Sequence, residues 1–323
     1  MKATAKNRRF RGFFARAVGV ALFAFSGLIL AGCGFGPGED TGDARLWVTR
    51  DYGAELLVDE PDLAVNESSN SMRVLDGLVE LETAYGGEYV QSVDGFAGGR
   101  EGGRSFDWFF SVNGIVAERG SAQFPVAGGD SVWWDYRDWT DAMEVGAVVG
   151  AYPAPFSTGY DDRDWGVQVD CLGQQTACGM VEKQLENQGV DLEDTGENMI
   201  LRVGPIDDVI RSPEGRRILR GPESSGLFVR FAAPTTGTPE GFPRNSAWHL
   251  LGLDVRGDDA TDYGPEAGLV AAMRRANDPP VWLITGGTEE AVQMAAAALT
   301  PADLERRYTA VVSGGRVSSL PLP

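Results

Sequence analysis

The N-terminus most constrains what this chain folds into, because it decides which residues remain to fold and in which compartment. Residues 1–16 contain six lysine and arginine residues and no acidic residue. An apolar run from Ala17 to Leu30 follows, and the small residues Ala31 and Gly32 come next. A basic segment, a short apolar segment and a small-residue cleavage site are typical of a secretory signal peptide. The run is shorter than the about 20 apolar residues of a membrane span, so we expect export.

The motif LAGC at residues 30–33 resembles the lipobox of bacterial lipoproteins. The resemblance implies that residues 1–32 are a lipoprotein signal peptide and that Cys33 carries the lipid. It also implies a chain anchored to the cell membrane on its extracytoplasmic face. The alternative is an ordinary signal peptide with an incidental cysteine. Residues 33–44 are rich in glycine and acidic residues, which predicts a flexible tether.

The charge of the chain argues against several classes of partner. Removing residues 1–32 removes six positive and no negative charges, which changes the formal net charge from −19 to −25. Such an acidic chain repels nucleic acid and anionic lipid headgroups. We therefore expect no nucleic-acid partner. The remaining length is sufficient for two domains.

The other two cysteines, Cys171 and Cys178, have six residues between them. In an exported chain we expect them to form a disulfide. The short loop predicts a local staple at the start of a helix rather than a long-range crosslink. A metal site is the alternative interpretation, but it lacks further ligands, because His249 is the only histidine.

Residues 45–148 show the pattern of a first domain, in which short strands surround one helix. Apolar residues at helical spacing predict a helix over Met72–Leu81, capped by Ser69 or Ser71. A glycine-rich loop spans residues 95–104, and Asn113-Gly114 predicts a tight hairpin turn. The expected strands are Leu46–Arg50, Ala54–Val58, Tyr89–Val93, a strand that runs from Phe106 into the Asn113-Gly114 turn, and Val132–Arg137.

Four segments in this region, VLDGL, YVQSVDG, WFFSVNG and GGDSVWWDY, follow one another in an order that resembles the DUF4430 domain. The resemblance covers roughly residues 45–140. That family is similar to the C-terminal β-domain of transcobalamin and intrinsic factor. The resemblance implies a β-grasp-like N-terminal domain in a chain of the α+β class. It also implies a cobalamin-like ligand and a vitamin-type uptake transporter as partner.

Residues 149–323 alternate between strand-like and helix-like runs, which predicts a mixed α/β domain. The expected strands are Trp165–Asp170, Met199–Val203, Gly226–Ala232, Trp248–Asp254, Val281–Thr285 and Tyr308–Val312. The expected helices are Cys178–Gln188, Ile206–Arg211, Pro265–Asn277, Thr288–Leu299 and Pro301–Arg306.

Aromatic residues are the best candidates for a binding site. Neighbours in a strand point to opposite faces, so if Trp134 and Tyr136 face the core, Trp133 faces the other way with Asp135 and Arg137. An aromatic side chain there could pack on a flat ligand, on the partner domain or on a neighbouring strand. By resemblance to the vitamin carriers, the candidate ligand-binding residues are Trp108, Phe110, Asn113, Trp133 and Tyr136.

Two other features favour structural roles. The segment Trp282–Glu290 predicts a strand, a glycine turn and a helix start, and Glu289 and Glu290 complement the helix dipole and repel phosphate. His249 lies in a buried-looking strand, so we interpret it as a core histidine.

Taken together, the sequence predicts a membrane-anchored lipoprotein that captures a small molecule for a transporter. The alternative is a cell-surface module that holds a protein or glycan partner. The sequence shows no recognised nucleophile, metal or cofactor motif, so we expect neither catalysis nor a bound cofactor.

Overall fold

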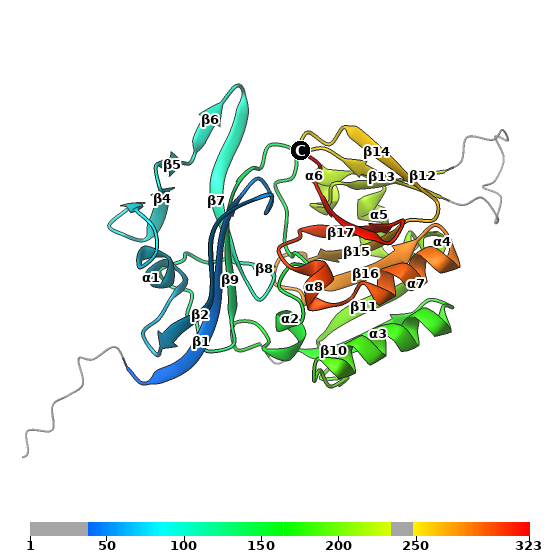
Figure 1. Ribbon diagram of the computed structural model, residues 1–323, viewed down its shortest axis with the longest axis horizontal. Coiled ribbons are helices and arrows are strands. Elements are labelled where there is room, and N and C mark those ends of the chain that lie inside the picture. Colours follow the sequence, from blue (N-terminus) through cyan, green and yellow to red (C-terminus); the bar gives the residue numbers. More distant parts are fainter. Residues whose placement is uncertain (1–37, 164, 234–247) are drawn as a thin grey trace, which may run out of the picture. The chain divides into compact units, whose positions relative to one another are not determined.

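The computed structural model describes residues 38–163, 165–233 and 248–323, whose helices and strands are drawn in Figure 1. The expected signal peptide and Cys33 lie outside these residues. The described residues belong to one compact unit, Pro37–Pro323. None of the described helices is long and apolar enough to cross a membrane. Within the described ranges, two six-stranded sheets, two three-stranded sheets and several helices make up an α+β fold, as predicted.

The first large sheet has the strand order β2-β1-β9-β7-β6, and β8 also pairs with β7. Its strands are β1 (Asp40–Arg50), β2 (Glu55–Asn66), β6 (Gly99–Glu101), β7 (Arg104–Val112), β8 (Ile115–Val116) and β9 (Ser131–Asp138). β1 and β9 are parallel, whereas the other pairs are antiparallel. Residues 40–44 were predicted to belong to the flexible tether, but they form the start of β1 instead. Their backbone forms the ladder with β2, and this backbone pairing does not require apolar side chains.

We call the described residues up to 148 the first half of the unit and those from 149 onward the second half. A short helix and a small sheet complete the first half. α1 (Ser71–Asp76) is shorter than predicted, because the chain leaves the helix at Gly77 and enters a strand at Leu81. Its cap is Asn70, whose side chain accepts a hydrogen bond from Arg73 N at 2.9 Å. Contrary to prediction, residues 95–104 are not a simple loop, since they contain β5 and β6. The small sheet consists of β3 (Leu81–Ala84), β4 (Tyr89–Val93) and β5 (Phe96–Ala97).

The second large sheet has the order β10-β11-β16-β15-β17-β18. Its strands are β10 (Gly166–Cys171), β11 (Asn198–Pro205), β15 (Gly268–Met273), β16 (Val281–Gly286), β17 (Thr309–Ser313) and β18 (Arg316–Leu320). Helices α3 (Gln175–Asn187) and α7 (Glu289–Ala297) pack on each other and against this sheet (Figure 1). The predicted helix start is present, with Glu289 and Glu290 in the first turn, and Thr288 Oγ1 caps it by accepting from Ala291 N at 3.1 Å.

The structure corrects one predicted helix, Pro265–Asn277, which is the strand β15. Every residue of β15 is buried, and the strand lies between β16 and β17. A strand buried on both faces has a continuous apolar sequence without alternation. A short apolar run of this kind cannot be told from a buried helix by its periodicity.

The remaining elements of the described residues are a small sheet and several short helices. A three-stranded sheet has the order β12-β13-β14, made of β12 (Val229–Ala232), β13 (His249–Leu253) and β14 (Asp259–Gly264). The short helices are α2 (Ala154–Ser157), α4 (Ile206–Val209), α5 (Pro213–Ile218), α6 (Pro222–Ser225) and α8 (Pro301–Leu304).

One hydrophobic cluster contains buried residues from both halves of the unit. Tyr52, from the turn after β1, packs edge-on against Phe228 and Tyr308, with ring centroids 5.0 Å apart in each pair. Gly150 allows the close approach, since a Cβ atom there would lie 2.7 Å from both Arg307 N and the Trp133 ring. The two halves therefore share a core, and only glycine fits at the crossing.

Candidate functional site

Aromatic side chains line one face of the central strands β7 and β9. Trp108 pairs with Tyr136 and Phe110 pairs with Trp134 in the register of the two strands. The rings of Trp108 and Tyr136 are 5.3 Å apart, and those of Phe110 and Trp134 are stacked at 4.8 Å. We call this surface the aromatic face; it consists of Tyr85, Tyr89, Phe96, Phe106, Trp108, Phe110, Trp134 and Tyr136.

The aromatic face changes from buried to exposed along its length. Trp134 and Trp108 are buried, with 2% and 6% of their surface exposed. By contrast, Phe96 is 36% exposed, Tyr89 42% and Tyr85 85%. The inner rings therefore belong to the core of this half, while the outer rings are available to a ligand.

Hydrogen bonds attach the outer part of the face to the inner part. Trp108 Nε1 donates to the Phe96 carbonyl at 2.7 Å, and the Tyr136 hydroxyl donates to the Ala97 carbonyl at 3.0 Å. Both bonds hold β5 against the large sheet. The Tyr89 hydroxyl donates to Asp107 Oδ2 at 2.7 Å. Burial, together with this bond to a carboxylate, raises the pKa of Tyr89 to about 12.

A cavity of about 170 Å³ opens beside these rings. Its walls include Tyr89, Trp108, Phe110, Trp134 and the side chain of Arg119. Sites for drug-sized ligands usually measure about 300–1,000 Å³. This cavity therefore accommodates a single ring-sized group, and a larger ligand would have to lie across the aromatic face.

Trp133 lies on the opposite face of β9, as strand alternation predicts for Trp133, Asp135 and Arg137. It is 2% exposed and packs edge-on against Tyr308 at 5.0 Å, so it contacts the other half of the unit. Its Nε1 donates to Thr49 Oγ1 at 2.8 Å. The structure therefore does not bring Trp133 together with Trp108.

Asp135 and Arg137 form a buried polar network beside Trp133. Asp135 accepts hydrogen bonds from Thr49 Oγ1 at 2.5 Å and from the Tyr308 hydroxyl at 3.1 Å, and also from the backbone N–H groups of Tyr52 and Gly53. Arg137 donates to the same Tyr308 hydroxyl, and its guanidinium lies 4.1 Å from the centre of the Phe109 ring. This face is sealed by the second half of the unit.

Asn113 occupies the predicted hairpin turn, with a φ of +52°. Its amide nitrogen donates to Asp130 Oδ1 and to the Gly159 carbonyl, each at 2.8 Å, while its oxygen accepts from Ser131 N at 2.8 Å. These bonds fix the turn to the neighbouring segments. Asn113 is 1% exposed and lies outside the aromatic face.

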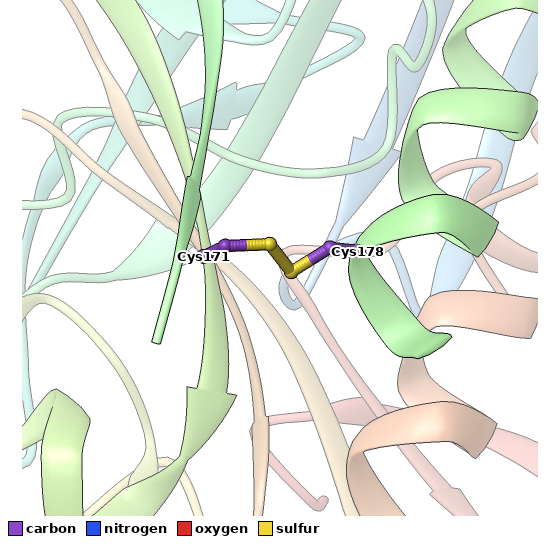
Figure 2. Close-up of a disulfide and its surroundings, with 2 residues drawn as sticks. All are labelled: Cys171 and Cys178. Atoms are coloured by element: carbon purple, nitrogen blue, oxygen red, sulfur yellow. A yellow bond between two sulfur atoms is a disulfide. The ribbon is translucent and has the colours of Figure 1, made fainter. Parts of the chain in front are cut away.

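The structure places Cys171 and Cys178 at disulfide distance, as predicted for a bond between them. Cys171 ends β10 and Cys178 lies in the first turn of α3, with their Cα atoms 6.0 Å apart (Figure 2). The bond attaches the helix to the edge of the second large sheet, as expected for a local staple. The third cysteine, Cys33, lies outside the described residues.

His249 is not the core histidine that the sequence predicted. Its side chain is 40% exposed, and its Nδ1 lies 2.9 Å from Asp262 Oδ2 on the neighbouring strand. The alternation of β13 turns it away from the core, where Leu250 is buried. The described residues contain no group of three or more histidine, cysteine, aspartate or glutamate side chains placed to hold a metal ion.

The residues of the aromatic face lie within a segment that matches a known family model. Residues 68–138 match the DUF4430 family, described as a domain of unknown function. The DUF4430 resemblance predicted from the sequence is thus confirmed over that range, which contains every residue of the aromatic face. No curated protein matches the chain.

One solved structure is similar to part of the chain. It is a crystal structure of a protein from Ruminococcus gnavus ATCC 29149 described as a "putative metal binding protein". The match has 17% sequence identity and a TM-score of 0.24, and covers 30% of this chain and 97% of that one.

Sequence reasoning missed several members of the aromatic face. Phe106 shares the period-two spacing of Trp108 and Phe110, so alternation alone could have found it. Phe96 could not be found in this way, because its position depends on a hydrogen bond from Trp108, twelve residues further along the chain. Tyr85 lies in the turn between β3 and β4, and no local pattern marks it as functional.

Proposed function

We propose that this chain is an extracytoplasmic lipoprotein, anchored to the cell membrane through Cys33, whose DUF4430 domain captures a small ligand for a membrane transporter. The observation that carries the binding proposal is the aromatic face, whose outer rings at Phe96, Tyr89 and Tyr85 are exposed. Neighbouring exposed rings of this kind are typical of ligand-binding and interaction surfaces.

Two features support export. The disulfide between Cys171 and Cys178 suits an oxidising compartment. The N-terminal segment has the basic, apolar and small-residue parts of a signal peptide, and the LAGC motif follows it.

The size of the cavity restricts how a ligand binds. A space of about 170 Å³ takes one ring or side group, so the rest of the ligand lies against the exposed rings. A planar macrocycle such as a corrin suits this arrangement. We therefore propose a cobalamin-like ligand and a β-grasp-like domain related to the transcobalamin β-domain, with a vitamin-type uptake transporter as partner.

Titration of the full chain with cobalamin, cobinamide and haem, followed by tryptophan fluorescence, tests the proposal. We expect quenching, and Phe96→Ser and Tyr85→Ser should each weaken binding about two- to tenfold, the value of one aromatic contact. Met143→Ser is the matched control, because Met143 is 67% exposed and lies outside the aromatic face. Equal affinities in the three variants, or no binding of any probe, would exclude this ligand class.

The second candidate function is a surface module for a protein or glycan partner. The high exposure of Tyr85, which lies outside the cavity, favours it, since aromatic residues are enriched in such interfaces. Binding of purified cell-wall glycan that depends on Tyr85 and Phe96, without binding of the macrocycles, would favour this function over the first.

The anchor has its own test. Mass spectrometry of the native protein should find diacylglyceryl on Cys33, and Cys33→Ser should move the protein from the membrane fraction to the medium. A Cys33→Ser variant that stays in the membrane fraction would contradict the lipid anchor but not the binding proposal.

A further inference from the structure

The exposed end of the aromatic face contains two tyrosine rings that meet edge to face. The ring centroids of Tyr85 and Tyr89 are 6.2 Å apart, and their planes are inclined at 74°. Tyr85 is 85% exposed and Tyr89 42%, so both rings are accessible from solvent. The face of an aromatic ring carries partial negative charge and attracts a cation within about 6 Å of its centre. Two rings at this angle therefore form a corner that suits a compact cation.

One ring of the aromatic face already contacts a cation of the chain itself. The guanidinium of Arg50 lies 4.2 Å from the centre of the Phe96 ring. Its Nε and Nη2 donate to Glu55 Oε2 at 3.0 Å and 2.5 Å, which holds the guanidinium in place. Among the described residues, no arginine or lysine lies over the rings of Tyr85 or Tyr89. These two rings remain available to a cation from outside.

The arginines near the aromatic face are already compensated by carboxylates. The ion pairs are Arg50 with Glu55, Arg104 with Asp138 and Asp141, and Arg119 with Asp161. Arg100 pairs with Ser105 in the register of β6 and β7, so it lies on the face opposite Phe106. The arginines therefore contribute little net positive charge to the aromatic face.

Several carboxylates around the face, by contrast, have no cationic partner in the described part of the chain. Asp107 Oδ2 lies 2.7 Å from the Tyr89 hydroxyl, and Glu88 borders the cavity beside that ring. Burial, followed by the negative charges of Glu101 and Asp107, raises the pKa of Tyr136. None of these three carboxylates forms an ion pair within the described ranges. The surroundings of the rings are therefore negative.

We propose that the aromatic face selects a ligand with a weakly hydrated positive charge, such as a quaternary ammonium group. Tyr85 and Tyr89 contact the cation through their ring faces, and Asp107 and Glu88 attract it. The inference rests on the binding function proposed for the aromatic face and adds the charge of the ligand. A cobalt(III) corrin without anionic substituents is also a cation, so the two proposals are compatible.

The test compares choline with dimethylbutanol, its tert-butyl analogue, in which a carbon atom replaces the charged nitrogen. Each probe is titrated against the full chain, and its methyl signal is followed by ¹H NMR, because ring currents shift methyl groups that lie over aromatic rings. We expect choline to bind about two- to thirtyfold more tightly, which is the range of cation–π contacts from exposed to desolvated sites. Equal affinities of the two probes, or an unmoved choline signal, would overturn the proposal.

Variants of the two tyrosines separate ring electrostatics from apolar contact. Tyr85→Leu and Tyr89→Leu keep an apolar side chain but remove the ring, so each should weaken choline about two- to fivefold. The affinity of dimethylbutanol should change little, which makes the neutral probe an internal control. Both side chains are partly or largely exposed, so the variants should fold like the parent chain.

Variants of the carboxylates test the attraction by charge. Glu88→Gln and Asp107→Asn keep the shape of the side chain and remove one negative charge, so each should weaken choline about two- to fivefold. Asp191→Asn is the matched control, because it removes an exposed carboxylate in the second half of the unit. Unchanged choline affinity in all four variants of the aromatic face and its carboxylates would overturn the proposal.

Failure of this inference and failure of the proposed function give different results. A chain that binds a macrocycle but does not distinguish choline from dimethylbutanol would keep the proposed function and contradict the charge selection. A chain that selects choline but binds no macrocycle would support the charge selection and exclude the macrocycles.

Discussion

The two faces of β9 carry similar aromatic residues, but one face leads to exposed rings and the other is buried beneath the second half of the unit. On one face, Trp134 and Tyr136 begin a series of rings that ends in exposed Phe96 and Tyr85. On the other, Trp133 lies beneath Tyr308 and beside a buried polar network. Residue type alone does not separate the two faces. What separates them is whether a distant segment of the chain covers them.

The comparison predicts its largest effect for Trp133→Ala. The indole is almost fully buried between the two halves, so its removal leaves a cavity, and we expect a loss of about 3–5 kcal/mol in the free energy of unfolding. Urea denaturation measures the loss. A cost below about 1 kcal/mol, as for ordinary surface substitutions, would show that this face is not sealed.

A smaller effect is expected for Asp135→Asn. The amide keeps the shape of the side chain but brings two N–H donors to a site where Thr49, Tyr308 and two backbone groups already donate. The mismatch should cost about 1–3 kcal/mol. Asp107→Asn is the control, because Asp107 accepts from the partly exposed Tyr89. Equal stabilities of the two variants would remove the contrast between the faces.

The aromatic face should show its own dependence on pH. The folded-state pKa of Tyr89, about 12, lies above the ordinary tyrosine pKa of about 10, so the folded state binds the proton more tightly than the unfolded state does. Its contribution to stability is complete below pH 10 and is lost as the pH rises toward 12. The effect is small, since the side chain is partly exposed.

Ultraviolet absorbance of ionised tyrosine follows this titration. Tyr89→Phe should remove the component near pH 12. Asp107→Asn should lower the pKa of Tyr89, because it removes the nearby negative charge. A titration curve identical in all three proteins would contradict the assigned hydrogen bond.

The smallest effect is expected for Tyr85→Ser. With 85% of its surface exposed, Tyr85 contributes little packing, and its replacement should change the free energy of unfolding by less than about 0.5 kcal/mol. Thermal unfolding compared with the parent chain is the measurement. A clear destabilisation would mean that Tyr85 serves the fold rather than a ligand.

Local patterns were sufficient to predict much of this geometry. Alternation placed Trp133, Asp135 and Arg137 on one face of β9, and Asn113-Gly114 gave the hairpin turn. The staple between Cys171 and Cys178 followed from spacing and compartment. In each of these cases the interacting groups are close in the chain or share one strand.

The parts that escaped prediction depend on contacts distant in sequence. Tyr308 covers Trp133 from a strand start 175 positions away, and nothing near Trp133 encodes that contact. The segment of β15 was predicted to be a helix, because its apolar sequence fits either structure and only its pairing with β16 and β17 makes it a strand. The aromatic face was found only in part, since Phe96 reaches it through the fold of β5.

The hydrophobic cluster common to both halves bears on whether the N-terminal half can be used on its own. If the chain were truncated after residue 148, Trp47, Tyr52 and Trp133 would be exposed to water as an apolar surface. Transplanting that piece into another protein therefore demands a new cover for the same three rings. The match to the DUF4430 family covers residues 68–138 and so includes Trp133 but not Trp47 or Tyr52, although all three belong to the shared cluster.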